Sequence, residues 1–174
     1  IKKVPKNKVG ICIAISYEKN EEAKKLYEDF VLSLGKALQN AENEHDIVVI
    51  EFPKGAVKNI NDLSTAKNIR QRSGVTLLLF GQTRLRNTPE GLKHIIDLRG
   101  LIRHQTINKK GAECFAKEFS NSLPQRFILD AEQNLMGCEI AAIHLQAAAK
   151  YIIGIAATFS YNLAYAEKLF QIDK

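Results

Sequence analysis

The chain has 174 residues, which is enough for one domain, or for one domain with an appendage. Hydrophobic residues make up 45% and charged residues 25% of it, which excludes a disordered chain and predicts a buried core. The formal net charge is +6, but lysines and glutamates are interspersed, as on a generic soluble surface. The charge alone therefore does not predict a nucleic-acid partner.

The first part of the chain predicts alternating strands and helices. Continuous apolar runs of strand length predict central strands, and apolar residues at helical spacing predict helices between them. The expected elements are a strand over 8–16, a helix over 20–43, a strand over 46–52, a helix over 63–72 and a strand over 75–80. Asn20 is a suitable N-cap for the first helix and Asn61 or Asp62 for the second. The pair Ser73 and Gly74 suits the end of the second helix.

Residues 81–104 predict a β-hairpin, because apolar and polar side chains alternate in both arms. If Asn87 pairs with Leu92, residues 88–91 form the turn, with a Pro and a closing Gly. We therefore interpret residues 1–108 as a β-α-β-α-β-β sheet domain of the α/β class. We expect both helices on one face and a sheet too shallow for a doubly wound nucleotide site.

The second part of the chain predicts helices only, and no strand pattern remains after Asn108. Helices are expected over residues 109–122, 139–157 and 163–172, while residues 127–136 are ambiguous. Along one side of the helix over 139–157 lie several apolar side chains: Ile140, Ile143, Ala147, Tyr151 and Ile152. Residues 109–174 are therefore predicted to be a separate helical segment.

The last two predicted helices resemble a tetratricopeptide (TPR) repeat. The motif has a small residue where paired helices touch, and Gly154 matches that position. Ala166 follows twelve residues later, and Phe170 lies four residues beyond Ala166. The chain departs from the motif at Lys150 and Ala157, where a TPR repeat has Trp and Tyr. The resemblance implies a protein-interaction role. Because a single repeat cannot bury its own face, we expect either that further repeats follow or that these helices pack back on the sheet.

Residues 8–107 resemble the TolB amino-terminal fold. The segments that carry this resemblance are residues 66–70, 74–82 and 96–99, which match a helix, a strand with its flanking glycines, and a return strand. In bacterial multidomain proteins this fold often precedes TPR arrays. The resemblance implies a non-catalytic adaptor or sensor and transfers no active site.

Enzyme and cofactor motifs are missing from the sequence. It has no phosphate-binding loop, no dinucleotide-binding glycine pattern, no serine-nucleophile elbow and no His or Cys cluster at metal-ligand spacing. We therefore expect no catalytic residues, no metal and no cofactor.

Two groups of residues are candidate sites. Asp46, Glu51 and Lys54 faintly resemble the carboxylates and lysine of a metal-dependent nuclease. Pro53 breaks the geometry, however, so solvated strand ends are favoured. The second candidate is a row of basic residues on the hairpin. The predicted register places these side chains together on the polar face: Arg84, Arg86, Arg99 and Arg103, with His104 nearby. Guanidinium groups grip phosphates or carboxylates, so the face suggests nucleic-acid or nucleotide/phosphate binding as a second hypothesis. The alternative is a solvated outer face partly neutralised by Asp97, and no aromatic residues interleave with the arginines for base stacking.

The cysteines indicate the compartment. Cys12, Cys114 and Cys138 are widely spaced and form no C-x-x-C pair, which predicts reduced thiols in a cytoplasmic protein. No apolar leader is visible, and the most apolar window, residues 147–166, contains Lys150 and several polar residues, so we predict no membrane span. The leading hypothesis is a non-catalytic protein-interaction or regulatory module of a bacterial TPR-containing protein.

Overall fold

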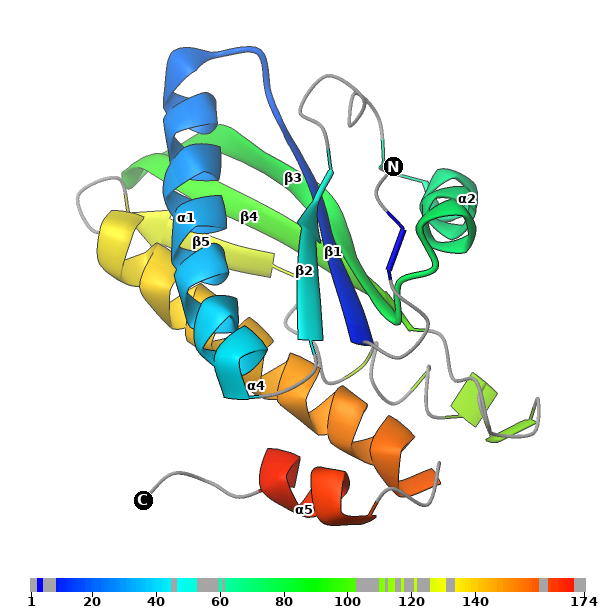
Figure 1. Ribbon diagram of the computed structural model, residues 1–174. Coiled ribbons are helices and arrows are strands. Elements are labelled where there is room, and N and C mark those ends of the chain that lie inside the picture. Colours follow the sequence, from blue (N-terminus) through cyan, green and yellow to red (C-terminus); the bar gives the residue numbers. More distant parts are fainter. Residues whose placement is uncertain are drawn as a thin grey trace.

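The α/β class is confirmed by a computed structural model of the chain (Figure 1), which describes residues 3–4, 9–44, 47–52, 60, 62–102, 110–111, 113–114, 117, 121, 126–130, 134–159 and 163–170. Among the elements within the described residues, strands and helices alternate through the third strand, and two further strands and two helices follow. The elements are β1 (Val9–Tyr17), α1 (Glu21–Glu44), β2 (Ile47–Glu51), α2 (Leu63–Ser73), β3 (Leu77–Thr88), β4 (Gly91–Ile102), β5 (Arg126–Asp130), α4 (Asn134–Phe159) and α5 (Leu163–Phe170).

The strands form one mixed sheet in the order β2-β1-β3-β4-β5. β1 is parallel to both of its neighbours, whereas β4 is antiparallel to β3 and β5 is antiparallel to β4. Side chains of β1 alternate between two hydrophobic cores, with Ile11 and Ile13 in one and Cys12 and Ala14 in the other. The apolar run over residues 8–16 predicted this burial on both faces, because a central strand has no polar side.

The two helices that connect the parallel strands lie on opposite faces of the sheet, so the prediction of one shared face is wrong. Leu26 and Phe30 of α1 belong to the core on one face, and Ala66 and Ile69 of α2 belong to the core on the other. The reason is the strand order: β2 and β3 flank β1 on opposite sides. Right-handed crossovers in opposite directions must leave the sheet on opposite faces.

Helix α2 begins and ends at the predicted caps. The Asp62 side chain accepts a hydrogen bond of 2.8 Å from the backbone N–H of Thr65. This N–H lies in the first turn of the helix, where backbone donors have no carbonyl acceptor within the helix. At the other end Gly74 has φ 69°, a left-handed conformation that glycine adopts without strain, and its N–H donates to the Arg70 carbonyl oxygen. The first turn of α1 is capped similarly, since Asn20 Oδ1 accepts from the Ala23 N–H at 2.6 Å.

A fifth strand lies at the start of the stretch that the sequence leaves ambiguous, so the prediction of no strand after Asn108 is wrong. β5 extends the sheet by pairing with β4, from Lys93 opposite Asp130 to Asp97 opposite Arg126. Phe127 and Leu129 point to the α1 side of the sheet, where they pack against its core, while Ile128 is exposed on the other. Five residues of alternating pattern at a sheet edge are too short to distinguish from helix by periodicity.

Helix α4 closes the same core that α1 covers (Figure 1). Its buried residues are mostly small, which lets the two helices approach closely: Cys138, Ala141, Ala142, Leu145 and Ala149. The predicted boundary between residues 1–108 and 109–174 therefore runs through a single hydrophobic core. Helices at 139–157 and 163–172 are confirmed as α4 and α5, and most of the predicted helix over residues 109–122 lies outside the described residues.

Candidate functional site

The hairpin has the predicted register, which decides where its arginines lie. Asn87 is opposite Leu92, so Arg84, Arg86 and Arg99 share one face of the sheet, as expected. Thr83 is on the other face, fully buried, and its hydroxyl donates a 3.0 Å hydrogen bond to the carbonyl oxygen of Ala23 in α1. The other two predicted site residues, at positions 103 and 104, lie outside the described residues.

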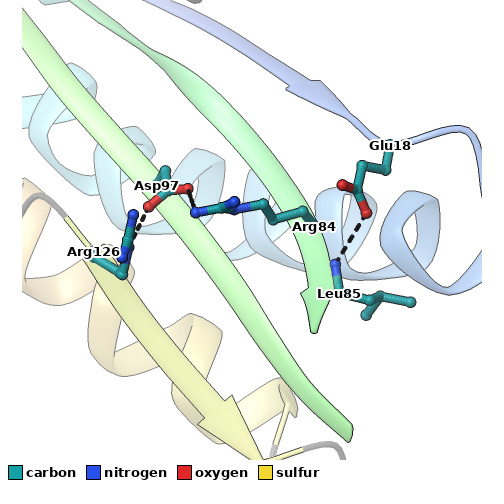
Figure 2. Close-up of polar contacts among 5 residues, drawn as sticks. All are labelled: Glu18, Arg84, Leu85, Asp97 and Arg126. Carbon is teal, nitrogen blue, oxygen red and sulfur yellow. Dashed lines mark hydrogen bonds and ion pairs between the residues drawn. The ribbon is translucent and has the colours of Figure 1, made fainter. Parts of the chain in front are cut away.

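Asp97 joins two of the arginines on this face (Figure 2). Its Oδ2 lies 2.8 Å from Nη2 of Arg84 on β3, and its Oδ1 lies 2.6 Å from Nε of Arg126 on β5. The carboxylate on the middle strand thus holds one guanidinium from each neighbouring strand. The Arg84 side chain is only 17% exposed, and its Nε has no hydrogen-bond partner among the described residues although that atom is buried. The Arg84–Asp97 pair therefore lies in a setting less screened than open surface, whereas the Arg126 side chain is 54% exposed.

The face is hollowed at this cluster. A cavity of about 540 Å³, which we call the arginine hollow, is lined by Ile60, Phe80, Gly81, Gln82, Arg84, Asp97, Arg99 and Arg126. Its charged lining has a net charge of +2. Arg99 lies opposite Phe80 on the neighbouring strand and is exposed. Arg86 is further out on the hairpin, also exposed, and does not line the hollow.

The end of β1 is tied to the base of the hairpin, which holds the wall of the hollow in place. The Ser16 hydroxyl donates to the Gly81 carbonyl oxygen at 3.1 Å, and the Glu18 N–H donates to the Thr83 carbonyl oxygen at 3.1 Å. The Glu18 carboxylate also accepts a 3.3 Å hydrogen bond from the Leu85 N–H (Figure 2).

A second feature is an exposed apolar row on α4, which we call the α4 stripe: Met136, Ile140, Ile143, Ala147 and Tyr151. The sequence predicted that four of these, from Ile140 onward, share a side, and the structure turns that side outward. The four large side chains are 48% to 58% exposed, whereas Leu145 on the opposite side is 1% exposed. Since the helix is already packed through its other side, the stripe is not needed for the core.

The three residues of the TPR-like pattern lie together where α5 returns along α4. The Phe170 ring lies directly against Gly154, Ala166 is buried, and the rings of Tyr151 and Phe170 are 6.1 Å apart at their centroids. Aromatic rings at this separation attract one another. Leu163 at the start of α5 is 61% exposed, so apolar surface is present on both helices.

The described part of the chain contains neither a cluster of metal-ligating side chains nor a membrane-spanning helix. There, no three His, Cys, Asp or Glu side chains gather closely enough to hold a metal ion. Nor does any helix within those residues combine the length and the apolar character needed to cross a bilayer. Comparison with protein-family models and with curated proteins finds no match for this chain.

Arg126 is the site residue that sequence reasoning missed. Arg126 lies in the site because the pairing of β5 with β4 places it opposite Asp97. The available signal was the alternation of residues 126–130, with Arg126 and Ile128 on one side and Phe127 and Leu129 on the other.

Proposed function

We propose that this chain is a non-catalytic protein-interaction module that docks a partner on the α4 stripe. One observation carries the proposal: four large apolar side chains lie on the solvent side of a helix whose other side is buried. Burial of apolar surface is the main favourable term in protein association, and contiguous exposed apolar surface marks interaction sites. The proposal assigns no chemical step to the chain.

The occupant that fits the stripe is an amphipathic helix of a partner protein. Successive members of the stripe are separated by four, three, four and four residues, so they form a ridge along four turns of α4. Such a ridge packs into the groove of another helix. The ridge continues through Tyr151 into the contact with Phe170, so a partner helix beside α4 would extend the packing that α5 begins.

Both resemblances support the same role. TPR repeats stack helix on helix, and a single helix pair leaves one face for the next helix. The TolB amino-terminal fold precedes such arrays in bacterial proteins, which supports an adaptor or sensor role in a cytoplasmic protein of that kind. The occupied face would then be the stripe, and the sheet domain would be the sensor.

Site-specific photo-crosslinking in cells tests the proposal. A photoreactive side chain replaces Ile143 on the stripe, and in a control it replaces Leu63 on α2, which is similarly exposed at 50%. We expect one dominant adduct from position 143, with a helical peptide of another protein, and none from position 63. The adduct should disappear when Ile140→Glu is added, since a buried carboxylate without a partner is unfavourable.

Three outcomes would contradict the proposal. They are equal adducts from both positions, no adduct from position 143, and adducts with a second copy of this chain only. The last would assign the stripe to self-association.

A further inference from the structure

We propose that the arginine hollow binds a small organic molecule through a phosphate monoester. This site is independent of the docking surface, because the hollow opens on the α2 face of the sheet and α4 covers the other. Four features of the hollow support this assignment: its place in the fold, its charge, its hydrogen-bond donors and its size.

The hollow lies over β3, β4 and β5, next to the carboxyl end of β1. It starts at residues 80–82 of β3, which pair with residues 14–16 of β1. The connections diverge to opposite faces at β1, since β2 and β3 flank it on opposite sides. In open α/β sheets ligands bind in the crevice between the strands at such a reversal, here β1 and β3, and the hollow adjoins that crevice on the β4 side of β3. Helix α2 packs on the same face only as far as Phe80, which forms part of the hollow's wall.

The charge of the hollow suits a dianion. Three arginines and one aspartate line it, and a phosphate monoester carries close to two negative charges at neutral pH. The Asp97 carboxylate neutralises part of the positive charge of the guanidinium groups and holds Arg84 and Arg126 in position. Ordering two long side chains in advance removes part of the entropic cost of binding. Fixed guanidinium groups then face a ligand without rearrangement.

Unused N–H groups remain for the ligand. A guanidinium has five N–H donors, and Asp97 takes Nη2 of Arg84 and Nε of Arg126. Within the described residues, the buried Nε of Arg84 has no acceptor. That atom is out of reach of a ligand in the hollow, so the donors available to a phosphate are the unused Nη groups of Arg84 and Arg126. Arg99 supplies a third guanidinium from β4.

Size and lining distinguish a small molecule from nucleic acid. The cavity of about 540 Å³ falls within the roughly 300–1,000 Å³ range of small-molecule sites. Ile60 and Phe80 in its lining are each only 1% exposed, so they offer no ring on which bases would stack. The hollow therefore suits a small molecule that carries one phosphate and not a nucleic-acid strand.

Isothermal titration calorimetry with phenyl phosphate tests the proposal, with inorganic phosphate and benzoate as comparison ligands. We expect saturable binding of phenyl phosphate, at least tenfold tighter than either comparison, because only this ligand supplies both the dianion and an organic body that occupies the rest of the hollow. Arg99→Gln should weaken binding at least tenfold without changing the unfolding temperature. Arg86→Gln is the matched control: it removes an exposed arginine on the same face outside the hollow and should leave the affinity unchanged.

The result that overturns the proposal is the absence of saturable phenyl phosphate binding, or an equal loss of affinity in the two variants. A single-stranded oligonucleotide that binds more tightly than phenyl phosphate and is weakened by Arg86→Gln would instead assign the whole arginine face to nucleic acid. Neither outcome bears on the α4 stripe, so this proposal can fail while the docking function stands.

Discussion

The Phe170 ring occupies the space beside Gly154 where another residue would have its Cβ. A Cβ built on Gly154 would come within 2.7 Å of Cζ of Phe170, which is closer than real Cβ contacts. A small residue at position 154 is therefore what lets α5 lie against α4. The ring is 44% exposed, so it can move outward, but only by giving up this contact.

Two glycine-to-alanine substitutions separate this contact from helix propensity. Gly35 in α1 has nothing within 4 Å of its Cβ position, so Gly35→Ala should raise the free energy of unfolding by about 0.5–1 kcal/mol. Gly154→Ala should raise the free energy of unfolding by clearly less, because the displacement of the Phe170 ring offsets the gain in helix propensity. Urea unfolding measures both. An equal gain in the two variants would show that the ring contact contributes nothing.

Gly81→Ala should destabilise the β3–β4 pairing. A Cβ at position 81 would collide with the backbone carbonyl oxygen of Asp97, and backbone in a paired strand cannot move aside as a side chain can. We expect a loss of roughly 1–3 kcal/mol in urea unfolding, the usual cost of overpacking. The same shift would displace Asp97 and weaken phenyl phosphate binding. Unchanged stability would contradict the close approach of these two strands.

The Asp62 cap predicts a pH dependence of stability. Hydrogen bonds from the Thr65 hydroxyl, the Thr65 N–H and the Ser64 hydroxyl hold the pKa of Asp62 well below its ordinary value. A depressed pKa in the folded state adds stability above the unfolded pKa of about 3.9, and this contribution is lost as the pH falls toward the folded pKa. Asp62→Asn keeps a capping oxygen without the charge.

Thermal unfolding of the two proteins between pH 7 and pH 2 checks this prediction. The original chain should be more stable than the variant at pH 7. The difference should shrink below about pH 4, because the Asp62 carboxylate of the unfolded chain then gains a proton while that of the folded chain does not. A difference that stays constant over this range would show that the charge on Asp62 does not stabilise the cap.

The three thiols should react at different rates. Burial raises the pKa of Cys12 and Cys138 to about 12, with help from Asp29 and Glu139 for the second, so neither forms a reactive thiolate at neutral pH. Cys114 is exposed. Mass spectrometry after iodoacetamide treatment should find label on Cys114 in the folded protein and on all three cysteines in guanidinium chloride. Rapid labelling of Cys12 in the folded state would contradict its place in the core.

The hairpin and the α2 caps could be predicted because their signals are local. Alternating side chains and the turn at residues 88–91 determine the hairpin register, and the register places Arg84 and Arg99 on one face. Asp62 and Gly74 act on backbone groups within a few residues of themselves. Each of these features depends on neighbouring residues, so the sequence contains the information needed.

The faces and the edge strand could not be predicted, because they depend on distant partners. An apolar stripe on α1 or α2 shows that the helix packs on a sheet but not on which face, since the face follows from the side of β1 that β2 occupies. β5 forms only because its backbone pairs with the edge of β4, and this pairing places Arg126 in the site. For α4, two sides are apolar, and only the position of α1 decides that Leu145 is buried and Ile143 is exposed.

Titration calorimetry with the partner identified by crosslinking tests the docking surface most directly, when the chain and its Ile140→Glu variant are compared. We predict that the variant binds the partner at least tenfold more weakly, equivalent to about 1.4 kcal/mol. Its unfolding temperature should be unchanged, because the Ile140 side chain is outside the core. Leu63→Glu, at a similarly exposed apolar position on α2, should bind normally. Unchanged affinity in the Ile140→Glu variant would contradict the claim that the α4 stripe is the docking surface.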